Sequence, residues 1–169
     1  MHMRRGVAAD ARELATAAER WFRETFSADN TAEDMAIYCA SAFSPDIQRA
    51  QLTDPAVETL LVHDPQGRLI AYAQLRDGAP EGMTLPSPIE LWRFYVDSSQ
   101  HGRGLAAQLM TAVEDAARTR GAKTLWLGVW EKNHRARAYY RKAGFLDIGS
   151  HEFPLGHDLQ TDRLLSRPL

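Results

Sequence analysis

The sequence predicts an α/β fold, with a mixed sheet of six or seven strands and helices on both faces. Two apolar runs, residues 89–96 and 124–130, are almost uninterrupted, as is typical of strands that are covered on both faces. Between them, from Leu105 to about Arg120, apolar residues recur every three or four positions and predict a helix. Two strands joined by one helix should be parallel, with a right-handed crossover.

The chain before these runs is expected to form a short strand, three helices and a hairpin. In order, these elements are expected at residues 5–8, 10–26, 31–43, 45–52, 57–63 and 69–75. Asp10 and Thr31 are placed to cap the first two helices, because their side-chain oxygens can accept hydrogen bonds from free N–H groups. Pro45 suits the first turn of the third helix. Residues 64–68 contain a proline and a glycine and should turn the hairpin.

The rest of the chain completes the alternation of helices and strands. Residues 77–88 contain two glycines and three prolines and should be a loop. Gly121 and Gly144 are expected to end the helices that precede them. The remaining elements are a helix and two antiparallel strands, at residues 133–143, 145–153 and 159–165.

Length and composition narrow the class of protein. The 169 residues, 44% of them hydrophobic, fit one domain spanning residues 1–169. A formal net charge of -2 gives no general attraction to nucleic acid or to an anionic membrane. The single cysteine, Cys39, cannot form an intrachain disulfide, which favours a reducing compartment. Since no apolar run approaches about 18 residues and no secretory signal is recognisable, we expect a cytoplasmic protein.

A glycine-rich segment lies between the first apolar run and the crossover helix. This glycine loop, residues 101–106, reads His-Gly-Arg-Gly-Leu-Ala. Gly102 and Gly104 can adopt positive φ and let a ligand approach the main chain closely. Several backbone N–H groups meet a helix N-terminus there, and Arg103 adds a positive charge. Such a place binds phosphate, so the loop indicates a phosphate-bearing ligand.

The residues after the second apolar run indicate which phosphate-bearing ligand the loop binds. Asn133, Tyr140 and the pair Gly144 and Phe145, together with the glycine loop, resemble the end of the catalytic core of the GCN5-related N-acetyltransferases, the GNAT superfamily. The resemblance covers about residues 90–145. It implies the GNAT layout, in which a central parallel strand pair flanks the cofactor. The family's loop begins with Gln or Arg where this chain has a histidine, His101, which changes a side chain in a loop that binds mainly through its backbone.

The resemblance also implies a cosubstrate, acetyl-CoA, whose acetyl group moves directly to a primary amine. Residues 94–96 would pair through their backbone with the pantetheine arm, and the N–H group of Val96 would lie where the oxyanion forms. Arg103 and Lys142 would approach the pyrophosphate. The residues implied to bind the cosubstrate are Phe94, Tyr95, Val96, His101, Gly102, Arg103, Gly104, Leu105, Ala106, Asn133, Ala136, Tyr140 and Lys142.

Tyr140 is the expected general acid. The departing thiolate needs a proton, and a phenol has a pKa close enough to that of a thiol to supply it. Asn133 and Tyr140 are seven residues apart and therefore share one face of the expected helix, with Arg137 between them. The resemblance places a tyrosine beside the sulfur at this position. The alternative is a packing residue whose hydroxyl bonds locally; the neighbouring Tyr139 should point away and pack.

Glu90 is the expected general base. A free aliphatic amine is mostly protonated at neutral pH, so its proton must be removed before it attacks. Glu90 is the only acid in the first apolar run, and its aromatic neighbours Trp92 and Phe94 could raise its pKa toward neutrality. Alternatively, Glu90 only lies at a solvated strand end and has no catalytic role. Glu131 could be the base instead, or the reaction could need no single base, as in some relatives.

A finer resemblance concerns the acceptor. Residues 126–133 and a C-terminal pattern resemble PaiA-type bacterial spermidine/spermine N-acetyltransferases, which makes a polyamine one candidate acceptor. The C-terminal pattern consists of His151, Phe153, Gly156, Asp158, Gln160, Thr161 and Asp162. A polycation would need carboxylates, for which Asp29, Glu33 and Asp34 are candidates. A solvated helix start is the favoured interpretation of these three acids.

Other functions stay open at this stage. The chain could be a non-catalytic sensor that binds acyl-CoA, or could acetylate a protein or peptide. A nicotinamide dehydrogenase is disfavoured, because the acid expected about 20 residues after the loop is absent from residues 122–124. The six histidines show no i, i+4 pair, so we expect no metal site. Cys39 lies far in sequence from the loop, which argues against an acetyl-cysteine intermediate, and many relatives are homodimers.

Overall fold

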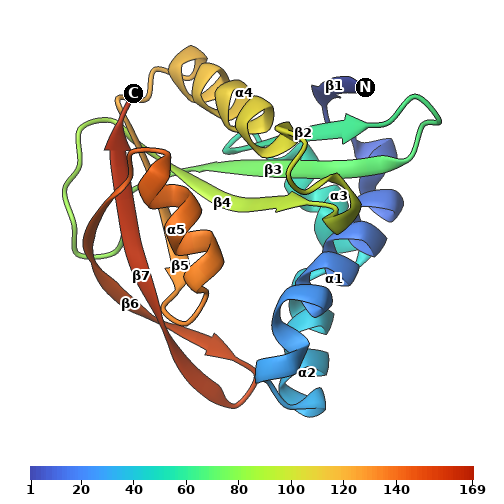
Figure 1. Cartoon of the computed structure of the whole chain (residues 1–169), viewed down its shortest axis with the longest axis horizontal. Coiled ribbons are helices and arrows are strands. Elements are labelled where there is room, and N and C mark those ends of the chain that lie inside the picture. Colours follow the sequence, from blue (N-terminus) through green and yellow to red (C-terminus); the bar gives the residue numbers. More distant parts are fainter.

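The computed structural model describes residues 1–169 and contains a seven-stranded sheet. The strands are β1 (His2–Arg5), β2 (Val57–His63), β3 (Leu69–Asp77), β4 (Pro88–Val96), β5 (Thr124–Trp130), β6 (Leu146–Leu155) and β7 (Asp158–Pro168). They lie in the order β1-β2-β3-β4-β5-β7-β6, with β4 and β5 parallel and all other neighbours antiparallel. The predicted mixed α/β fold is therefore confirmed (Figure 1).

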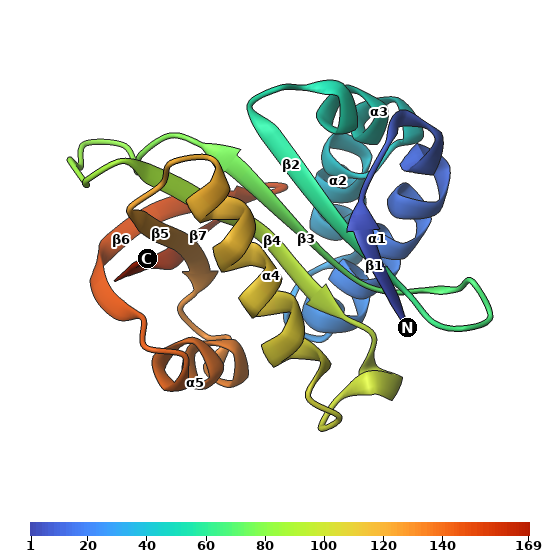
Figure 2. The same ribbon diagram turned by 90° about the horizontal axis from the view of Figure 1, so that it is seen from above.

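Five helices cover the two faces of this sheet. They are α1 (Ala11–Phe26), α2 (Ala32–Ala42), α3 (Pro45–Thr53), α4 (Leu105–Thr119) and α5 (His134–Lys142). Figure 2 shows α1, α2 and α3 on one side, with α4 and α5 on the other. Each side has its own apolar core: Trp21, Met35 and Tyr72 belong to the first, and Leu109 and Leu127 to the second. None of the helices combines the length and the apolar character needed to cross a membrane.

The parallel strands β4 and β5 separate soon after they begin. Only three residue pairs join them, and the last is Glu90 with Trp126. On its other edge, β4 contains a bulge at Trp92, because Gln74 of β3 pairs with Arg93 while Leu75 pairs with Leu91. Figure 1 shows the consequence: β2, β3 and β4 run across the view, while β5, β6 and β7 are steeply inclined to them. The sheet therefore opens between the C-terminal ends of β4 and β5.

The N-terminal segment corrects two predictions. The first strand ends at Arg5 rather than covering residues 5–8, because the chain turns into a short 3-10 helix at Ala8–Asp10. Asp10 does not cap α1 with its side chain. Its carboxylate instead accepts a hydrogen bond from the N–H group of Val7 (2.8 Å) and two from Arg4 (2.7 and 2.8 Å). The acid thus stabilises the turn before the helix.

The last two strands extend further than expected, and their turn contacts the start of α2. Thr31 caps that helix as predicted, by accepting a hydrogen bond from the N–H group of Asp34. Asp34 in turn accepts one from the N–H group of His157 (2.6 Å), in the turn between β6 and β7. Gly156 in this turn has φ +62, and a Cβ atom there would overlap Asp34. This contact joins the turn between β6 and β7 to the start of α2.

Candidate active site

A cleft of about 680 Å³ lies where β4 separates from β5. Its walls come from α1, β4, β5, α5 and the hairpin of β6 and β7, and just over half of its lining residues are hydrophobic. Toward α5 the walls carry backbone and aromatic groups, among them Phe94 and Tyr140. Toward α1 and β7 they carry ionisable groups, among them Glu90, Arg93 and Asp162. We call these two parts the cofactor end and the acceptor end.

The glycine loop forms the rim of the cofactor end. Gly102 and Gly104 both have positive φ (75° and 80°), and Gly104 is the N-cap of α4. The backbone N–H groups of Gly102, Gly104, Leu105 and Ala106 donate no hydrogen bond to any acceptor in the protein. Four free donors at the positive end of a 15-residue helix can bind a phosphate or pyrophosphate. The loop thus has the chemistry that its sequence predicts.

His101 links this loop to both sides of the cleft. The guanidinium of Arg135 donates to its Nδ1 (2.8 Å), so Nε2 is the protonated nitrogen and donates to the carbonyl of Val96 (3.0 Å). His101 and Ala106 line the cleft, whereas Gly102 and Gly104 are exposed beside it and Leu105 is buried. Arg103 and Lys142 are exposed and do not line it. Any contact of these two cations with a ligand would therefore lie at the outer rim.

The end of β4 offers backbone groups to the cleft. Asp97 donates its N–H group to Ile70 (2.9 Å), at the end of the ladder with β3. Because only alternate residues bond to the same neighbour, the backbone of Tyr95 faces β3, and that of Phe94 and Val96 faces the opposite edge. β5 has already separated on that edge. An extended ligand arm can therefore pair there as an added strand would.

Tyr140 lies on α5 among aromatic rings. The ring centroids of Phe94, Tyr139 and Phe145 are 6.5, 5.4 and 5.5 Å from its own. The side chain lines the cleft, and its hydroxyl has no hydrogen-bond partner in the protein. Burial raises the pKa of Tyr140, so the phenol carries its proton at neutral pH. Tyr139 differs, since its hydroxyl donates to the carbonyl of Ala106 (3.1 Å).

Asn133 determines where α5 begins. Its side-chain oxygen accepts a hydrogen bond from the N–H group of Ala136 (3.1 Å), and both residues line the cleft. Arg137 lies one turn further along and donates to the carbonyl of Glu131 (2.8 Å). Neither Arg137 nor Glu131 lines the cleft. Of the two carboxylates considered as a base, Glu90 is therefore the one that the cleft contains.

Glu90 is buried, with an exposed fraction of 8%. Arg76 donates to its Oε2 through Nε (2.8 Å) and lies 2.6 Å from it through Nη2, while Oε1 has no hydrogen-bond partner. Burial raises the pKa of Glu90, and the positive charge of Arg76 opposes part of that shift. Glu90 can therefore hold a proton at a higher pH than an exposed glutamate.

A histidine and a carboxylate at the acceptor end were not among the predicted catalytic residues. His151 and Asp162 face each other across β6 and β7, with 3.6 Å between Nε2 and Oδ2. Both line the cleft, and burial raises the pKa of Asp162. Gly128 of β5 leaves room for them, because a Cβ atom there would lie 3.2 Å from Asp162 Oδ2. Only strand pairing brings them together, and the sequence does not give that pairing.

Arg93 was also not predicted. It is buried, with an exposed fraction of 8%, and lines the acceptor end. Its Nη1 donates to the side-chain oxygens of Gln51 and Gln74 (both 2.8 Å). Its guanidinium lies 4.2 Å from the ring centroid of Trp92 and 5.1 Å from that of Phe43. Its counterparts are thus neutral amides and aromatic rings.

The three acids considered for a polycation lie outside the cleft. Asp29 and Glu33 are exposed, and Asp34 is bonded to Thr31 and His157. Cys39 is buried in the core beneath α2 and does not line the cleft either. The arrangement therefore gives neither a carboxylate cluster from α2 nor a reactive thiol to the acceptor end.

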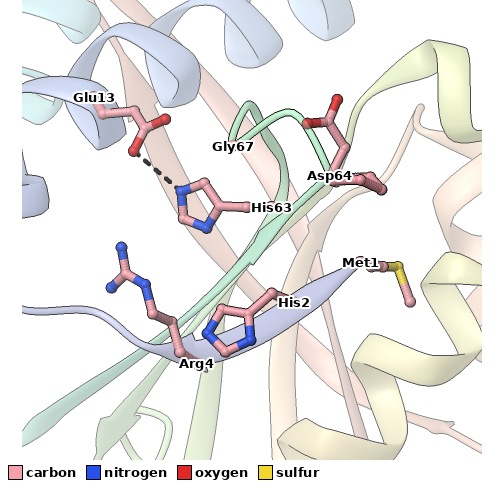
Figure 3. A pocket seen from close by; sticks show the side chains of 8 residues that line it. Met1, His2, Arg4, Glu13, His63, Asp64 and Gly67 are labelled. Atoms are coloured by element: carbon pink, nitrogen blue, oxygen red, sulfur yellow. Dashed lines mark hydrogen bonds and ion pairs between the residues drawn. The ribbon is translucent and has the colours of Figure 1, made fainter.

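A second hollow lies near the N-terminus, on the edge of the sheet formed by β1. Figure 3 shows Met1, His2, Arg4 and Asp64 around it, with Glu13 paired to His63 at 3.2 Å. Met1 is its only hydrophobic lining residue, and it is open to solvent. It has no enclosed apolar wall and shares no residue with the cleft, so the cleft is the better candidate for the active site.

Comparison with known proteins agrees with this geometry. The model of the acetyltransferase (GNAT) family matches residues 15–145. An uncharacterized N-acetyltransferase of Mycobacterium tuberculosis is 35% identical over 161 residues, or 95% of this chain and 98% of that protein. One from Lactobacillus delbrueckii subsp. lactis is 32% identical over 161 residues, or 95% of this chain and 92% of that protein.

A solved structure gives the same result for the fold. The PaiA N-acetyltransferase from Thermoplasma acidophilum, in complex with coenzyme A, superposes with a TM-score of 0.81. The superposition covers 99% of this chain and 98% of that one, at 15% sequence identity. The family match, the relatives and the cleft between β4 and β5 lead to one conclusion: this chain belongs to the GNAT family, as an N-acetyltransferase that uses acetyl-CoA.

Proposed function

We propose that the enzyme transfers the acetyl group directly from acetyl-CoA to a primary amine, and that Tyr140 protonates the departing thiolate. The observation that carries this proposal is the Tyr140 hydroxyl, which lies at the cleft without a hydrogen-bond partner in the protein. A buried phenol normally finds such a partner. A free, protonated hydroxyl at the cleft is suited to donate to a sulfur atom.

The chain's own groups would hold the cosubstrate along the cofactor end. The free N–H groups of the glycine loop would bind the pyrophosphate, and the backbone of Phe94 and Val96 would pair with the pantetheine arm. The N–H group of Val96 would donate to the thioester oxygen as negative charge develops there. Asn133 and Ala136 would position Tyr140 by determining where α5 begins.

In this reaction the lone pair of the neutral amine attacks the thioester carbonyl carbon. A C–N bond forms, the C–S bond breaks, and the Tyr140 hydroxyl gives its proton to the sulfur. The phenolate is reprotonated by the proton that the nitrogen loses. The balance is one amine and one thioester converted into one amide and one thiol. The buried position of Cys39 supports direct transfer, because it offers no thiol to an acetyl-cysteine intermediate.

Glu90 is the proposed acceptor of the proton that the ammonium group must first lose. Its raised pKa and its free Oε1 support this role. His151, oriented by Asp162, is the alternative at the same end of the cleft. A neutral imidazole also accepts a proton near neutral pH. Variants of Glu90 and His151 show which of the two accepts the proton.

A polyamine is one candidate acceptor. It is supported by the sequence resemblance to PaiA-type enzymes and by acidic groups and aromatic rings at the acceptor end, such as Glu90, Asp162 and Trp130. The positive charges of Arg93 and Arg76, which also line the cleft, argue against a polycationic acceptor. Peptide or protein amines are the other acceptor class, and a non-catalytic acyl-CoA sensor is the alternative to catalysis.

The experiment is a measurement of thiol release from acetyl-CoA with polyamines, amino acids, peptides and aminoglycoside antibiotics as acceptors. We expect release with at least one primary amine and a loss of about 100-fold or more in Tyr140→Phe. Acetyl-CoA binding measured by calorimetry serves as the control. Tight binding without release for any acceptor would favour the sensor.

Two further parts of the proposal concern location and assembly. A single, buried cysteine suits a reducing compartment, and we propose a cytoplasmic enzyme on that ground. A homodimer is proposed from the family resemblance alone. Sedimentation analysis of the purified protein tests the second point, because a monomer at working concentration would exclude it.

A further inference from the structure

We infer that the amine acceptor also carries a carboxylate, and that Arg93 binds it. This inference rests on the proposed function, since the carboxylate belongs to the same molecule as the reacting amine. It makes an amino acid, or a short peptide with a free carboxyl end, a better acceptor than a polyamine.

Arg93 is a buried cation without an anionic partner. Its exposed fraction is 8%, and both of its hydrogen bonds go to neutral amide oxygens. The charge of Arg93 lowers the pKa of Glu90, but the carboxylate of Glu90 pairs with Arg76, and that of Asp162 pairs with His151. The remaining neighbours are phenols, and the charge of Arg93 lowers the pKa of Tyr38, Tyr72 and Tyr95 against the effect of burial. A buried charge is costly unless something pairs with it.

The geometry leaves one side of the guanidinium available. Nη1 makes both hydrogen bonds to amides, to Gln51 and Gln74, and no carboxylate of the protein pairs with the edge formed by Nε and Nη2. The neutral Tyr38 hydroxyl is the other polar group beside the guanidinium. Trp92 and Phe43 contact the group and restrict its plane. A guanidinium held in this way presents two parallel N–H donors, which match the two oxygens of a carboxylate. The cleft reaches Arg93, so a ligand can approach it.

The bulge in β4 places Arg93 where an acceptor can use it. In a regular strand, residues 90 and 93 would point to opposite faces. The extra residue at Trp92 brings both to one face, as their partners show: Arg93 pairs with Gln74, and Glu90 with Arg76, two residues apart on β3. The candidate base and the cation therefore lie on the same side of the sheet. One small molecule could place its amine near Glu90 and its carboxylate on Arg93.

The test compares pairs of acceptors that differ only in the carboxylate. Lysine is compared with cadaverine, an amino acid with its amide, and a dipeptide with its C-terminal amide. We expect kcat/KM to be at least 10-fold higher for the carboxylate member of at least one pair. Arg93→Gln should remove that preference, because kcat/KM should fall more for the carboxylate member of the pair than for the amide member. Phosphoethanolamine, which combines an amine with a phosphate, distinguishes a carboxylate site from a general anion site.

Two further variants protect the test against misfolding. Arg93→Lys keeps the charge but lacks the two parallel donors, so it should lose most of the preference while retaining the fold. Arg163→Gln is the matched control, because Arg163 of β7 pairs with Asp147 of β6 and does not line the cleft. Equal rates for both members of every pair, a preference for polyamines, or an equal loss for both members in Arg93→Lys would overturn the inference.

A binding measurement separates this inference from the proposed function. If no acceptor is acetylated, the proposed function fails, and an N-acetylated amino acid and its amide are titrated calorimetrically into the protein with coenzyme A. The inference expects at least 10-fold tighter binding of the carboxylate form to the wild type, and the loss of most of this difference in Arg93→Lys. Equal binding to the wild type would overturn it.

Discussion

The two ends of the cleft are built in different ways. The cofactor end comes from one continuous stretch, residues 94–145, and presents mainly backbone groups: the free N–H donors of the glycine loop and the unpaired edge of β4. The acceptor end is assembled from α1, β4, β6 and β7, and presents side chains. Its two polar side-chain contacts, Glu90 with Arg76 and His151 with Asp162, each join two strands.

This difference has a physical consequence. Backbone donors exist whatever side chain each residue carries, so the cofactor end should tolerate substitutions that keep the local conformation. The acceptor end depends on particular charged groups in particular registers, so a single substitution there should change specificity. Tyr140 is the exception at the cofactor end, because it contributes a side-chain hydroxyl rather than a backbone group.

The largest effect is expected for Tyr140→Phe. Removing the hydroxyl leaves the thiolate without its proton donor, so kcat should fall by about 100-fold to 1,000-fold. The ring remains packed between Phe94 and Phe145, so the melting temperature should change little. Steady-state rates of thiol release, measured with saturating acetyl-CoA, give kcat.

The matched control for this variant is Tyr139→Phe. That phenol donates to the carbonyl of Ala106 on the neighbouring helix, so its loss should affect stability by about 1 kcal/mol and kcat by less than a factor of three. An unchanged kcat in Tyr140→Phe, or an equal fall in both variants, would argue against Tyr140 as the acid.

The second effect concerns how the acceptor end is held together. Gly156→Ala would introduce a Cβ that overlaps Asp34, at a residue with φ +62. Overpacking and backbone strain together should lower the free energy of unfolding by about 3 kcal/mol. Urea denaturation followed by circular dichroism measures this loss.

Gly67→Ala separates strain from overlap. Gly67 has φ +80, yet a Cβ atom there would meet nothing within 4 Å. It should therefore show only the strain, about 1 kcal/mol. Equal losses in the two variants would mean that the contact between the β6–β7 turn and α2 contributes nothing.

The third effect is a change in pH dependence at the acceptor end. A base works only when deprotonated, so kcat/KM should fall as the pH is lowered through the pKa of Glu90. Because burial raises that pKa, the fall should begin at a higher pH than an exposed glutamate would give. Glu90→Gln should reduce kcat/KM by about 10-fold or more and should abolish this fall at low pH, the acidic limb of the pH profile.

Two companion variants sharpen this result. Arg76→Met removes a positive charge that lowers the pKa of Glu90, so the limb should move to higher pH. His151→Gln should leave the limb in place if Glu90 is the base. If the limb instead survives in Glu90→Gln and disappears in His151→Gln, then His151, held by Asp162, accepts the proton.

The same contrast explains what the sequence could predict. The cofactor end was predictable because its information is local: the glycine loop, Asn133 and Tyr140 follow one another along the chain, and the parallel pair of strands follows from the crossover helix. The acceptor end was not, because the bulge at Trp92 and the register of β6 with β7 are tertiary features. The bulge and the register decide which side chains meet. A shift of one residue in either would turn these side chains to the other face of the sheet.

Individual residues illustrate this limit. Arg93 sits in an apolar run and gives no local sign of being a buried cation facing a cleft. Asp34 looked available to a polycation, but the turn that follows β6 occupies it. Residues 5–8 have the composition of a strand, yet the carboxylate of Asp10 bonds Val7 and turns the chain into a helix. In each case a contact over several residues or more overrides the local pattern.

The smallest effect is expected for His101→Gln, which introduces a residue type that the family uses at this position. The imidazole links Val96 to Arg135, but the loop's free donors are backbone groups that do not depend on it. Glutamine can also donate to one group and accept from the other. The Kd for acetyl-CoA, measured by calorimetry, should therefore change by less than about threefold, or under about 0.7 kcal/mol. A loss of 10-fold or more would mean that the histidine itself binds the cosubstrate, and the contrast between a backbone-built cofactor end and a side-chain-built acceptor end would fail.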